Sequence, residues 1–344
     1  MIRTAATALC IAWALAAPAA EVRLDAASAG KDVQDALRAS SLTLAEAAKK
    51  DPTPLDLLAA AKADYSRLVG VLYAQGYYSP VIQIRVDGRE AAGIPPYETP
   101  DRIGTITLSV TPGPQFMFSQ ARVAPLAPGT TLPEDFATGR IARSTVIQQA
   151  AEAGVEGWRD VGHAKARVTD QTITADHRAN TLAADITLTP GARLTFGGLV
   201  ITGKSDVRPE RIRAIAGLPS GKTFSPKVLE RAATRLRRTG TFRSVALSEA
   251  ETPNPDGSLD ITAALLDEKK HRIGAGVELS TTEGLKLSAY WLHRNLLRGA
   301  ERFRLDGEVS GIGGTSGGVD FKLGASLTRP ATFNPDTSLG LSAA

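Results

Sequence analysis

Hydrophobic and polar residues alternate with a period of two over the last part of the chain. From Arg272 to Ser280 the apolar residues alternate with polar or small ones, and the alternation returns in 285–291, 302–309 and 319–328. A period of two places the two sets of side chains on opposite faces of a β-strand. The pattern therefore predicts four consecutive strands that share one apolar face and one face of charges and glycines.

Two kinds of antiparallel sheet have one apolar and one polar face. In a transmembrane β-barrel the apolar face contacts lipid and the polar face lines the lumen. In a soluble sheet the apolar face is buried against a core. Alternation alone does not separate the two structures, so the remainder of the chain has to be considered.

Three helix ends of similar sequence recur earlier in the chain, and each contains a glycine at the same place: Gly76, Gly162 and Gly240. A second marker, Thr-Pro-Gly, occurs at Gly113 and again at Gly191. The interval from Gly162 to Gly240 equals the interval from Gly113 to Gly191. Two independent markers at one spacing predict three tandem repeats.

The third repeat has the clearest pattern of elements. A short strand at 199–201 precedes a short helix, and a longer helix begins after Ser225 with Pro226 at its first position, where a missing N–H has no cost. Two strands, 242–247 and 259–266, follow around a Pro-Asp-Gly turn. The predicted order is strand, helix, helix, strand, strand.

The first two repeats fit the same order. In the first, the opening strand, long helix and hairpin are predicted at 22–24, 55–74, and 81–86 with 103–110. In the second they are predicted at 116–123, 146–161, and 164–173 with 182–188. Each repeat has the size of a small domain. The expected domains are 21–112, 113–191 and 192–269, followed by the sheet region 270–344.

The N-terminus has the pattern of a secretory signal peptide. Arg3 precedes an apolar run from Ala5 to Ala17, and an A-x-A site follows. The run is shorter than the about 20 apolar residues that a spanning helix needs. We therefore expect a signal peptide over 1–20, cleaved in the region of Ala17, Ala19 and Ala20. Cys10, the single cysteine, lies inside it, so the mature chain is expected to carry no thiol.

Composition excludes several classes of function. The 40 basic and 36 acidic residues give a net charge of +4, without a basic run long enough for nucleic-acid binding. The four histidines show no metal-ligand spacing, so no metal or other cofactor is expected. Residues 314–318 match the G-x-S-x-G motif of hydrolases, but that motif requires a helix after it. A strand pattern follows instead, so we expect a hairpin loop, no catalytic residue and no enzyme.

The order of these features resembles the outer-membrane assembly family typified by BamA and TamA. The segments that carry the resemblance are Gly76-Tyr77-Tyr78, Thr189-Pro190-Gly191, Phe196-Gly197, Val200–Gly203, Gly240-Thr241-Phe242, Arg272–Val277 and Asn295–Gly299. Members have a signal peptide, periplasmic POTRA domains and a C-terminal barrel. Three repeats, rather than five, are nearest to the TamA branch. The resemblance implies an α+β protein with tandem POTRA domains (β-α-α-β-β) followed by the first strands of an antiparallel transmembrane β-barrel.

The predicted strands are too few to complete such a barrel. Closure takes at least about eight strands, and an open sheet edge in hydrocarbon leaves backbone groups without partners. We therefore expect that the sequence is truncated and lacks most of the barrel.

The resemblance also implies a function, in which β-barrel and autotransporter proteins are assisted into the outer membrane of a Gram-negative bacterium. POTRA sheet edges could accept an additional strand in the periplasm. The first barrel strand could pair with a client through Arg272, Ile273, Gly274, Ala275, Gly276, Val277, Glu278 and Leu279. Its glycines could ease opening of the barrel or serve only its curvature.

The partners that the resemblance implies are unfolded outer-membrane proteins, the lipid bilayer and a TamB-like inner-membrane protein that contacts residues 21–112. Two alternatives remain open. A two-partner secretion transporter shares the architecture but normally has two POTRA units. A soluble periplasmic adaptor would pack its final strands on themselves.

Overall fold

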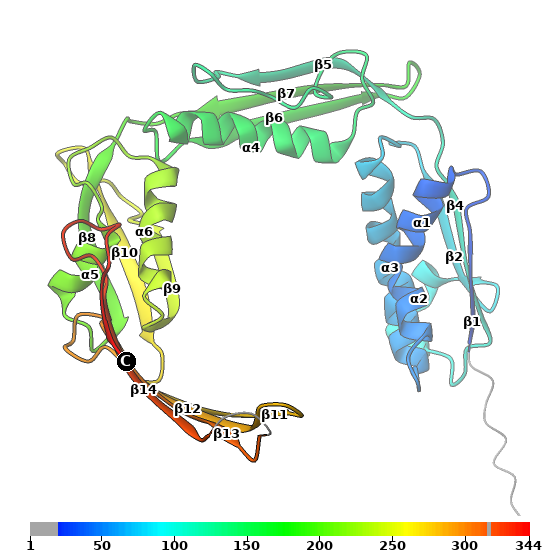
Figure 1. Ribbon diagram of the computed structural model, residues 1–344. Helices are drawn as coiled ribbons and strands as arrows, with labels where there is room; N and C mark the ends of the chain where they lie inside the picture. The colour runs from blue at the N-terminus through cyan, green and yellow to red at the C-terminus, as the bar shows by residue number, and fades with distance from the viewer. Residues whose placement is uncertain (1–19, 315–317) are drawn as a thin grey trace, which may run out of the picture. The chain divides into compact units, whose positions relative to one another are not determined.

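The computed structural model describes residues 20–314 and 318–344 (Figure 1). It divides into two compact units. The N-terminal unit holds the first repeat and the larger part of the second. The C-terminal unit holds the remainder of the second repeat, the third repeat and the final sheet. The predicted signal segment, with Ala17 and Ala19, lies outside the described residues, and Ala20 is the half-buried residue immediately before the first strand.

The first repeat packs three helices on one sheet. Its elements are β1 (Glu21–Asp25), α1 (Lys31–Ser40), α2 (Leu42–Ala47), α3 (Pro54–Ala74), β2 (Val81–Val86), β3 (Arg89–Glu90), two 3₁₀ turns (Ala91–Gly93 and Pro96–Glu98) and β4 (Thr105–Thr111). The strand order is β1-β4-β2-β3, with β1 parallel to β4. Thr53 caps α3 by accepting a hydrogen bond from the Asp56 amide at 3.1 Å. The predicted long helix and hairpin lie where the pattern indicated.

A buried carboxylate ties two helices of this repeat together. Asp64 of α3 is fully buried and accepts hydrogen bonds from the Ser41 hydroxyl at 2.7 Å and the Thr43 hydroxyl at 2.6 Å. It also accepts from the backbone amides that begin α2. The carboxylate thus accepts from amides at the start of α2 that have no partner within their own helix.

The second repeat contains one helix where the template has two. Its elements are β5 (Met117–Ala124), α4 (Ser144–Asp160), β6 (Arg167–Asp176) and β7 (Thr181–Thr189), with strand order β5-β7-β6. Residues 125–143 contain no helix. This segment carries Pro125, Pro128 and Pro133 together with two glycines, and prolines remove amide donors while glycines raise the entropy cost of a helix. The repeat therefore follows the order β-α-β-β.

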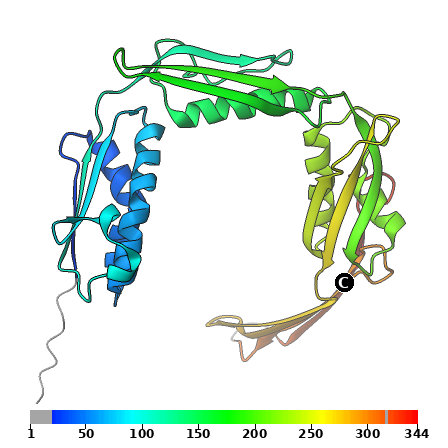
Figure 2. The ribbon, with the colours of Figure 1, turned by 180° about the vertical axis from the view of Figure 1, so that it is seen from behind.

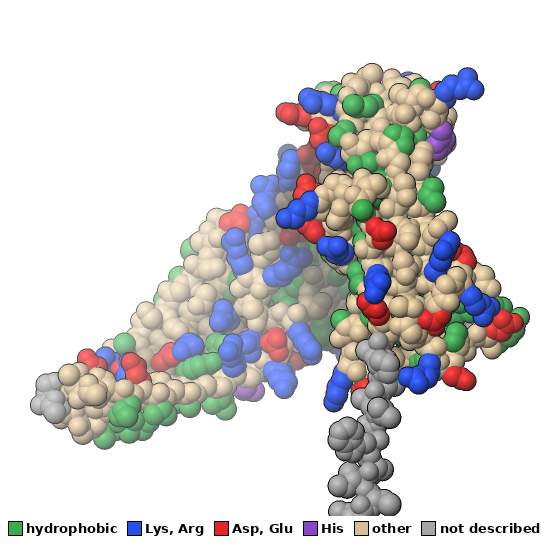
Figure 3. All heavy atoms as spheres, turned by 90° about the vertical axis from the view of Figure 1, so that its right-hand side faces the viewer, with side chains coloured by type: hydrophobic (Ala, Val, Ile, Leu, Met, Phe, Trp, Pro, Cys, Tyr) green, Lys and Arg blue, Asp and Glu red, His purple; other side chains and the backbone are tan. Residues whose placement is uncertain are grey.

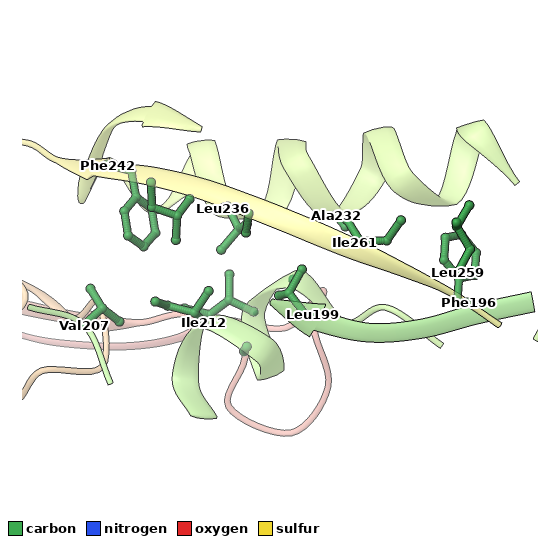
Figure 4. Close-up of a cluster of buried hydrophobic side chains, with 14 of the residues drawn as sticks. Phe196, Leu199, Val207, Ile212, Ala232, Leu236, Phe242, Leu259 and Ile261 are labelled. Atoms are coloured by element: carbon green, nitrogen blue, oxygen red, sulfur yellow. The ribbon is translucent and has the colours of Figure 1, made fainter. Parts of the chain in front are cut away.

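The third repeat follows the predicted order. Its elements are β8 (Thr195–Lys204), α5 (Pro209–Ala216), α6 (Pro226–Arg238), β9 (Phe242–Glu249) and β10 (Ser258–Asp267). Strand β10 lies between β8, to which it is parallel, and β9, as the view from behind in Figure 2 shows. Both helices lay apolar side chains on this sheet, and Phe196, Leu236 and Ile261 are fully buried between the layers (Figure 4).

The last region is an antiparallel sheet of consecutive strands. Its elements are β11 (His271–Ser280), β12 (Gly284–Arg294), β13 (Arg302–Ile312), β14 (Asp320–Arg329) and β15 (Leu339–Ala343). Neighbours in sequence pair in the order β11-β12-β13-β14-β15. Four of these strands were predicted from the alternation. The fifth, β15, is short, and it follows a loop that contains Pro330 and Pro335, so its pattern was not recognised.

Candidate functional site: an exposed sheet and its edge strand

The strand register collects the apolar residues of the final sheet on one face. Ile273 lies opposite Trp291, which lies opposite Leu305 on the next strand, and the neighbouring rows match in the same way. We call this set the apolar face: Ile273, Ala275, Val277, Leu279, Leu285, Leu287, Ala289, Trp291, Phe303, Leu305, Gly307, Val309, Phe321, Leu323, Ala325, Leu327, Leu339 and Leu341.

Large side chains of the apolar face are exposed. The exposed fractions are 77% for Ile273, 81% for Leu279 and 77% for Phe321. Figure 3 shows hydrophobic side chains gathered along this face of the sheet. A soluble sheet with one apolar face buries that face against a core, and soluble proteins rarely expose so continuous a patch. Within the described residues, the face is therefore an apolar surface without a protein cover.

The opposite face carries charges that pair across the strands. The Glu308 carboxylate of β13 forms ion pairs with Lys286 at 3.2 Å and with Lys322 at 3.6 Å, one lysine on each neighbouring strand. Arg304 pairs with Asp306 of the same strand and lies over the ring of Tyr290 on β12, 4.1 Å from its centroid. Cross-strand pairs of opposite charge stabilise a sheet. The sheet thus has the two unlike faces that the alternation predicted.

Strand β11 forms one edge of the sheet. Its residues pair with β12 from His271 to Ser280, and no other described strand pairs with it. All eight residues of the predicted client-pairing segment lie in β11. An unpaired strand edge presents backbone N–H and C=O groups that another chain can bind. Assignment of β11 to client pairing remains a prediction.

Close packing explains the two glycines of β11. A Cβ added at Gly274 would lie 2.3 Å from Cε1 of Tyr290, and one added at Gly276 would lie 2.9 Å from the Ser288 hydroxyl. The Tyr290 ring therefore occupies the space that a side chain at Gly274 would need. This contact joins β11 to β12 across the polar face, so the glycines serve packing as well as strand geometry.

Four aromatic rings cluster at the end of the sheet nearest the third repeat. His271 stacks on Trp291 with ring centroids 5.5 Å apart, and His293 and Phe303 contact the same indole. The sequence showed no metal-ligand spacing among the four histidines, whereas the register brings His271 and His293 together with Trp291 and Phe303. Aromatic residues with polar groups are typical of the interface between lipid and water.

The turn between β12 and β13 is fixed by two buried polar side chains. The Glu301 carboxylate, 2% exposed, accepts from the Gly299 amide at 2.8 Å and the Leu297 amide at 3.3 Å. The Asn295 side chain accepts from the Ala300 amide at 3.0 Å. Asn295, with a φ of 66°, begins the turn in the left-handed region. These bonds explain the conformation of the segment Asn295–Gly299, which carries part of the resemblance described above.

Two connecting segments of the sheet pack against the third repeat: 295–301, and 330–338 between β14 and β15. Ala300 and Ala331 are buried in the core of that repeat. Arg211 of α5 donates to the carbonyl oxygens of Pro330 at 2.5 Å and Ala331 at 3.2 Å, and burial lowers its pKa. The third repeat and the sheet are thus joined by both packing and hydrogen bonds.

The repeats also have sheet edges. In the third repeat these are β8 and β9, and in the second they are β5 and β6. In the first repeat the short strand β3 pairs with the end of β2 through Arg85 and Val86, which covers part of that edge. In the second and third repeats, segments 139–142 and 221–224 pair with the starts of β5 and β8. Strands β6 and β9 and the later parts of β5 and β8 are therefore the open edges of these repeats in the described part of the chain.

The G-x-S-x-G match is only partly described by the structure. Thr315, Ser316 and Gly317 of the G-x-S-x-G match lie outside the described residues, while Gly314 and Gly318 lie in the connection between β13 and β14. In 20–314 and 318–344 no group of His, Cys, Asp and Glu has the arrangement of a metal site. In the same residues, every helix is too short or too polar to cross a membrane.

A comparison with protein families matches residues 194–265 to the POTRA model, described as surface antigen variable number repeat. This segment runs from just before β8 almost to the end of β10. The third repeat is therefore a POTRA domain. The curated proteins contain no match to the chain.

Among solved structures, the chain is similar to BamA from Haemophilus ducreyi lacking POTRA domains 1–3, with 22% sequence identity and a TM-score of 0.52. That match covers 66% of this chain and 42% of the other, so the chain spans less than half of that BamA structure. POTRA domains 3–5 of Haemophilus influenzae BamA have 18% identity and a TM-score of 0.49, over 72% and 95% of the two chains. CdiB from Escherichia coli has 18% identity and a TM-score of 0.39, over 67% and 42%.

The likeness to the first of these structures concerns the fold. Together with the POTRA match, it confirms the predicted fold class of POTRA-type α+β repeats followed by part of an antiparallel sheet.

Proposed function

We propose that this chain belongs to an outer-membrane assembly factor of the BamA and TamA type, without enzymatic activity. The observation that carries the proposal is the exposed apolar face, which is in register across the sheet and directly follows a POTRA domain. A sheet with one apolar face and one charged face is typical of a membrane barrel, in which the apolar face contacts lipid and the charged face lines the lumen. The sheet then lies in the outer membrane of a Gram-negative bacterium, and the repeats lie in the periplasm.

The proposed action is strand pairing with an unfolded client. Strand β11 has a free edge of backbone donors and acceptors, so a client strand can extend the sheet there. The edges of the second and third repeats offer the same backbone chemistry in the periplasm. No covalent step is required, since each added strand exchanges hydrogen bonds with water for hydrogen bonds within a sheet.

The domain bounds, the inner-membrane partner and the clients are assigned from the resemblance to the TamA branch. We propose domains at 21–112, 113–191, 192–269 and 270–344 after a signal peptide of residues 1–20. A TamB-like inner-membrane partner would contact the first domain, and autotransporters would be among the clients. Three repeats support this branch over a two-partner secretion transporter, which normally has two POTRA units.

Site-directed crosslinking tests the role of β11. The only natural cysteine, Cys10, lies in the predicted signal peptide, so an introduced cysteine is unique in the mature chain. Ala275→Cys in β11 is compared with Gly307→Cys in β13, because both belong to the same row of the apolar face. We expect adducts with cysteine-bearing strands of outer-membrane clients from position 275 and few from position 307.

Three outcomes would revise the proposal. Equal adducts from both positions would contradict pairing at the edge. Adducts with one dedicated exported protein alone would favour a two-partner secretion transporter. Extraction of the chain from membranes by carbonate would favour the soluble adaptor.

A further inference from the structure

The first repeat differs from the other two in the side on which its sheet is open. Strand β2 has the same place in its repeat as β6 and β9 have in theirs, since each follows the long helix and pairs with the central strand. Strands β6 and β9 are open edges, whereas the chain after β2 returns to the sheet as β3. This connection, 87–104, is longer than the corresponding connections 177–180 and 250–257.

The edge of β2 is closed by contacts from within the repeat. The Ile84 amide donates to the Tyr65 hydroxyl of α3 at 3.3 Å, and that hydroxyl donates to the Glu90 carboxylate of β3. Two residues further along β2, Val86 pairs with Arg89. A strand added to β2 would have to break these contacts, so this edge does not take one at Ile84 or Val86.

The connection that closes β2 is part of the folded core. Ala91 and Ile94 are at most 1% exposed and belong to the buried cluster of the first repeat. The Lys62 ammonium of α3 donates to the Ile94 carbonyl, and Asp87 accepts from the Thr105 amide at 2.7 Å. These contacts hold the connection along its length, so the closure of β2 is a permanent feature of the repeat.

Strand β1 forms the opposite edge of the same sheet (Figure 1). Among the described residues only β4 pairs with it. The Glu21 amide donates at 2.9 Å to a backbone carbonyl just before β4. Because the backbone groups of successive residues point to opposite sides of a strand, those of Val22 and Leu24 point away from β4. By register these two residues share rows with Val86 and Ile84, so the sheet is open at β1 where it is closed at β2.

The side chains of β1 define the kind of strand that can pair with it. Val22 and Leu24 are half-buried and pack against the core. Glu21, Arg23 and Asp25 lie on the other, exposed face, which therefore carries a negative, a positive and a negative charge in order. Opposite charges on neighbouring strands stabilise a sheet. The matching strand has apolar residues on the core side and an acidic residue between two basic ones on the outer side.

We propose that β1 is the docking edge for an extended strand of a partner protein with this alternation. The charge pattern is symmetric about Arg23, so it fits a parallel or an antiparallel strand. A second copy of the chain fits poorly, because β1 paired with β1 in full register places like charges opposite each other in either direction. The inference deepens the proposed function and rests on its contact between the first domain and a periplasmic partner.

Fluorescence anisotropy of labelled peptides with the full chain in detergent tests this edge. One peptide alternates valine with lysine, glutamate and lysine, and the other alternates valine with glutamate, lysine and glutamate. We expect the first to bind about tenfold more tightly. Since the chain has a net charge of +4, nonspecific attraction would favour the second peptide instead. No binding of the first peptide, or equal affinity for both, would overturn the proposal.

Val22→Pro tests pairing through the backbone. It removes the N–H that faces the open side, and proline is tolerated at such positions of edge strands. We expect the first peptide to bind about tenfold more weakly, because one of its carbonyl groups loses a donor. Val22→Ala keeps the N–H and is the matched control, with a smaller loss expected. Equal losses in the two variants would overturn strand addition.

Arg23→Glu tests the charge pattern without a change in the backbone. The exposed face of β1 becomes uniformly negative, so the first peptide should bind about tenfold more weakly, and a peptide with three lysines should bind tightly again. Arg67→Glu, on the exposed side of α3, is the same change away from β1. Similar losses in both variants would show that overall charge controls binding and would overturn the site.

Two further measurements separate this inference from its alternatives. Sedimentation of the chain alone reports self-association, and a dimer that Val22→Pro dissociates would assign β1 to a second copy and overturn the partner strand. The titrations need neither a client nor a membrane, whereas crosslinking from position 275 tests the proposed function. Failure of the titrations with that crosslinking intact would overturn docking at β1 alone.

Discussion

Strands β10 and β11 follow one another in the chain, share the same alternation and differ completely in burial. In β10 the apolar residues Leu259, Ile261 and Leu265 are at most 3% exposed. In β11, Ile273 and Leu279 are 77% and 81% exposed. Only residues 268–270 separate the two strands.

The difference lies in what covers each strand. Helices α5 and α6 precede β10 in the chain and fold back over its apolar side, so that Leu236 and Ile212 reach the same core. No described helix follows β11 to do the same. Alternation therefore identifies the two faces of a strand, whereas the nature of the surroundings depends on other segments.

The largest expected effect on stability comes from a substitution in β10, the strand whose apolar side is buried. Ile261→Ala is expected to destabilise the third repeat by about 2–5 kcal/mol, because it leaves a cavity in a closely packed core. Val277→Ala in β11 is the matched change, and it should alter this stability by at most about 0.5 kcal/mol. Hydrogen exchange of peptides from β8 to β10, in vesicle-reconstituted chain, measures both. Comparable effects would contradict the contrast between the strands.

A charge on the apolar face tests its contact with lipid. Val277→Arg is expected to cost about 2–4 kcal/mol if the residue lies near the bilayer midplane. Ser310→Arg, on the polar face opposite Asp320, is the control and should cost far less. Urea unfolding in lipid vesicles gives both values. Equal tolerance of the two arginines would indicate that the apolar face does not meet lipid.

The connection between the two regions can be weakened at α5. Arg211→Ala removes the donors to the carbonyls of Pro330 and Ala331, for an expected loss of about 1–3 kcal/mol. Arg213→Ala, on the exposed side of the same helix, serves as the control. Hydrogen exchange in 330–338 should rise in the first variant only. Unchanged exchange would show that packing of Ala300 and Ala331 is sufficient.

The smallest effect concerns pH. Asp206 of the third repeat pairs with Lys270, just before β11, at 2.7 Å. The pKa of Asp206 is lowered, first by the hydrogen bond from Lys270 and then by its charge. Because the folded pKa lies below the unfolded value of about 3.9, the pair contributes stability above that value.

This contribution is lost as the pH falls through the folded pKa. The stability difference between unmodified chain and Asp206→Asn should therefore be constant near neutral pH and disappear in acid. A difference that grows below pH 4 would contradict this sign. The comparison is measured by urea unfolding over a series of pH values.

Much of the fold could be predicted from local pattern. The helix start at Pro226 and the long helix of the first repeat depend on neighbouring residues, and both lie where predicted. The absence of a first helix in the second repeat was harder to predict. The order of elements in the other repeats favours a helix there, whereas the prolines and glycines of 125–143 disfavour one. Strand β15 was missed since its short alternation follows an irregular loop.

The candidate site was less predictable. The alternation located β11, but the contact of Gly274 with Tyr290 depends on the strand register. The cluster of His271, Trp291, His293 and Phe303 depends on it as well. The closure of β2 by Tyr65 and Glu90 joins residues of separate elements, and only a folded chain brings them together.

The sequence by itself determined which residues share a face, where the repeats lie and that two unlike faces exist in the final sheet. The shared faces follow from periods of two and of 3.6, which are local consequences of backbone geometry. The repeats follow from sequence markers that recur at one spacing. Only the tertiary structure decided which apolar faces are covered and which edges stay open. Coverage depends on packing between distant segments, so β10 became part of a core while β11 remained an exposed edge.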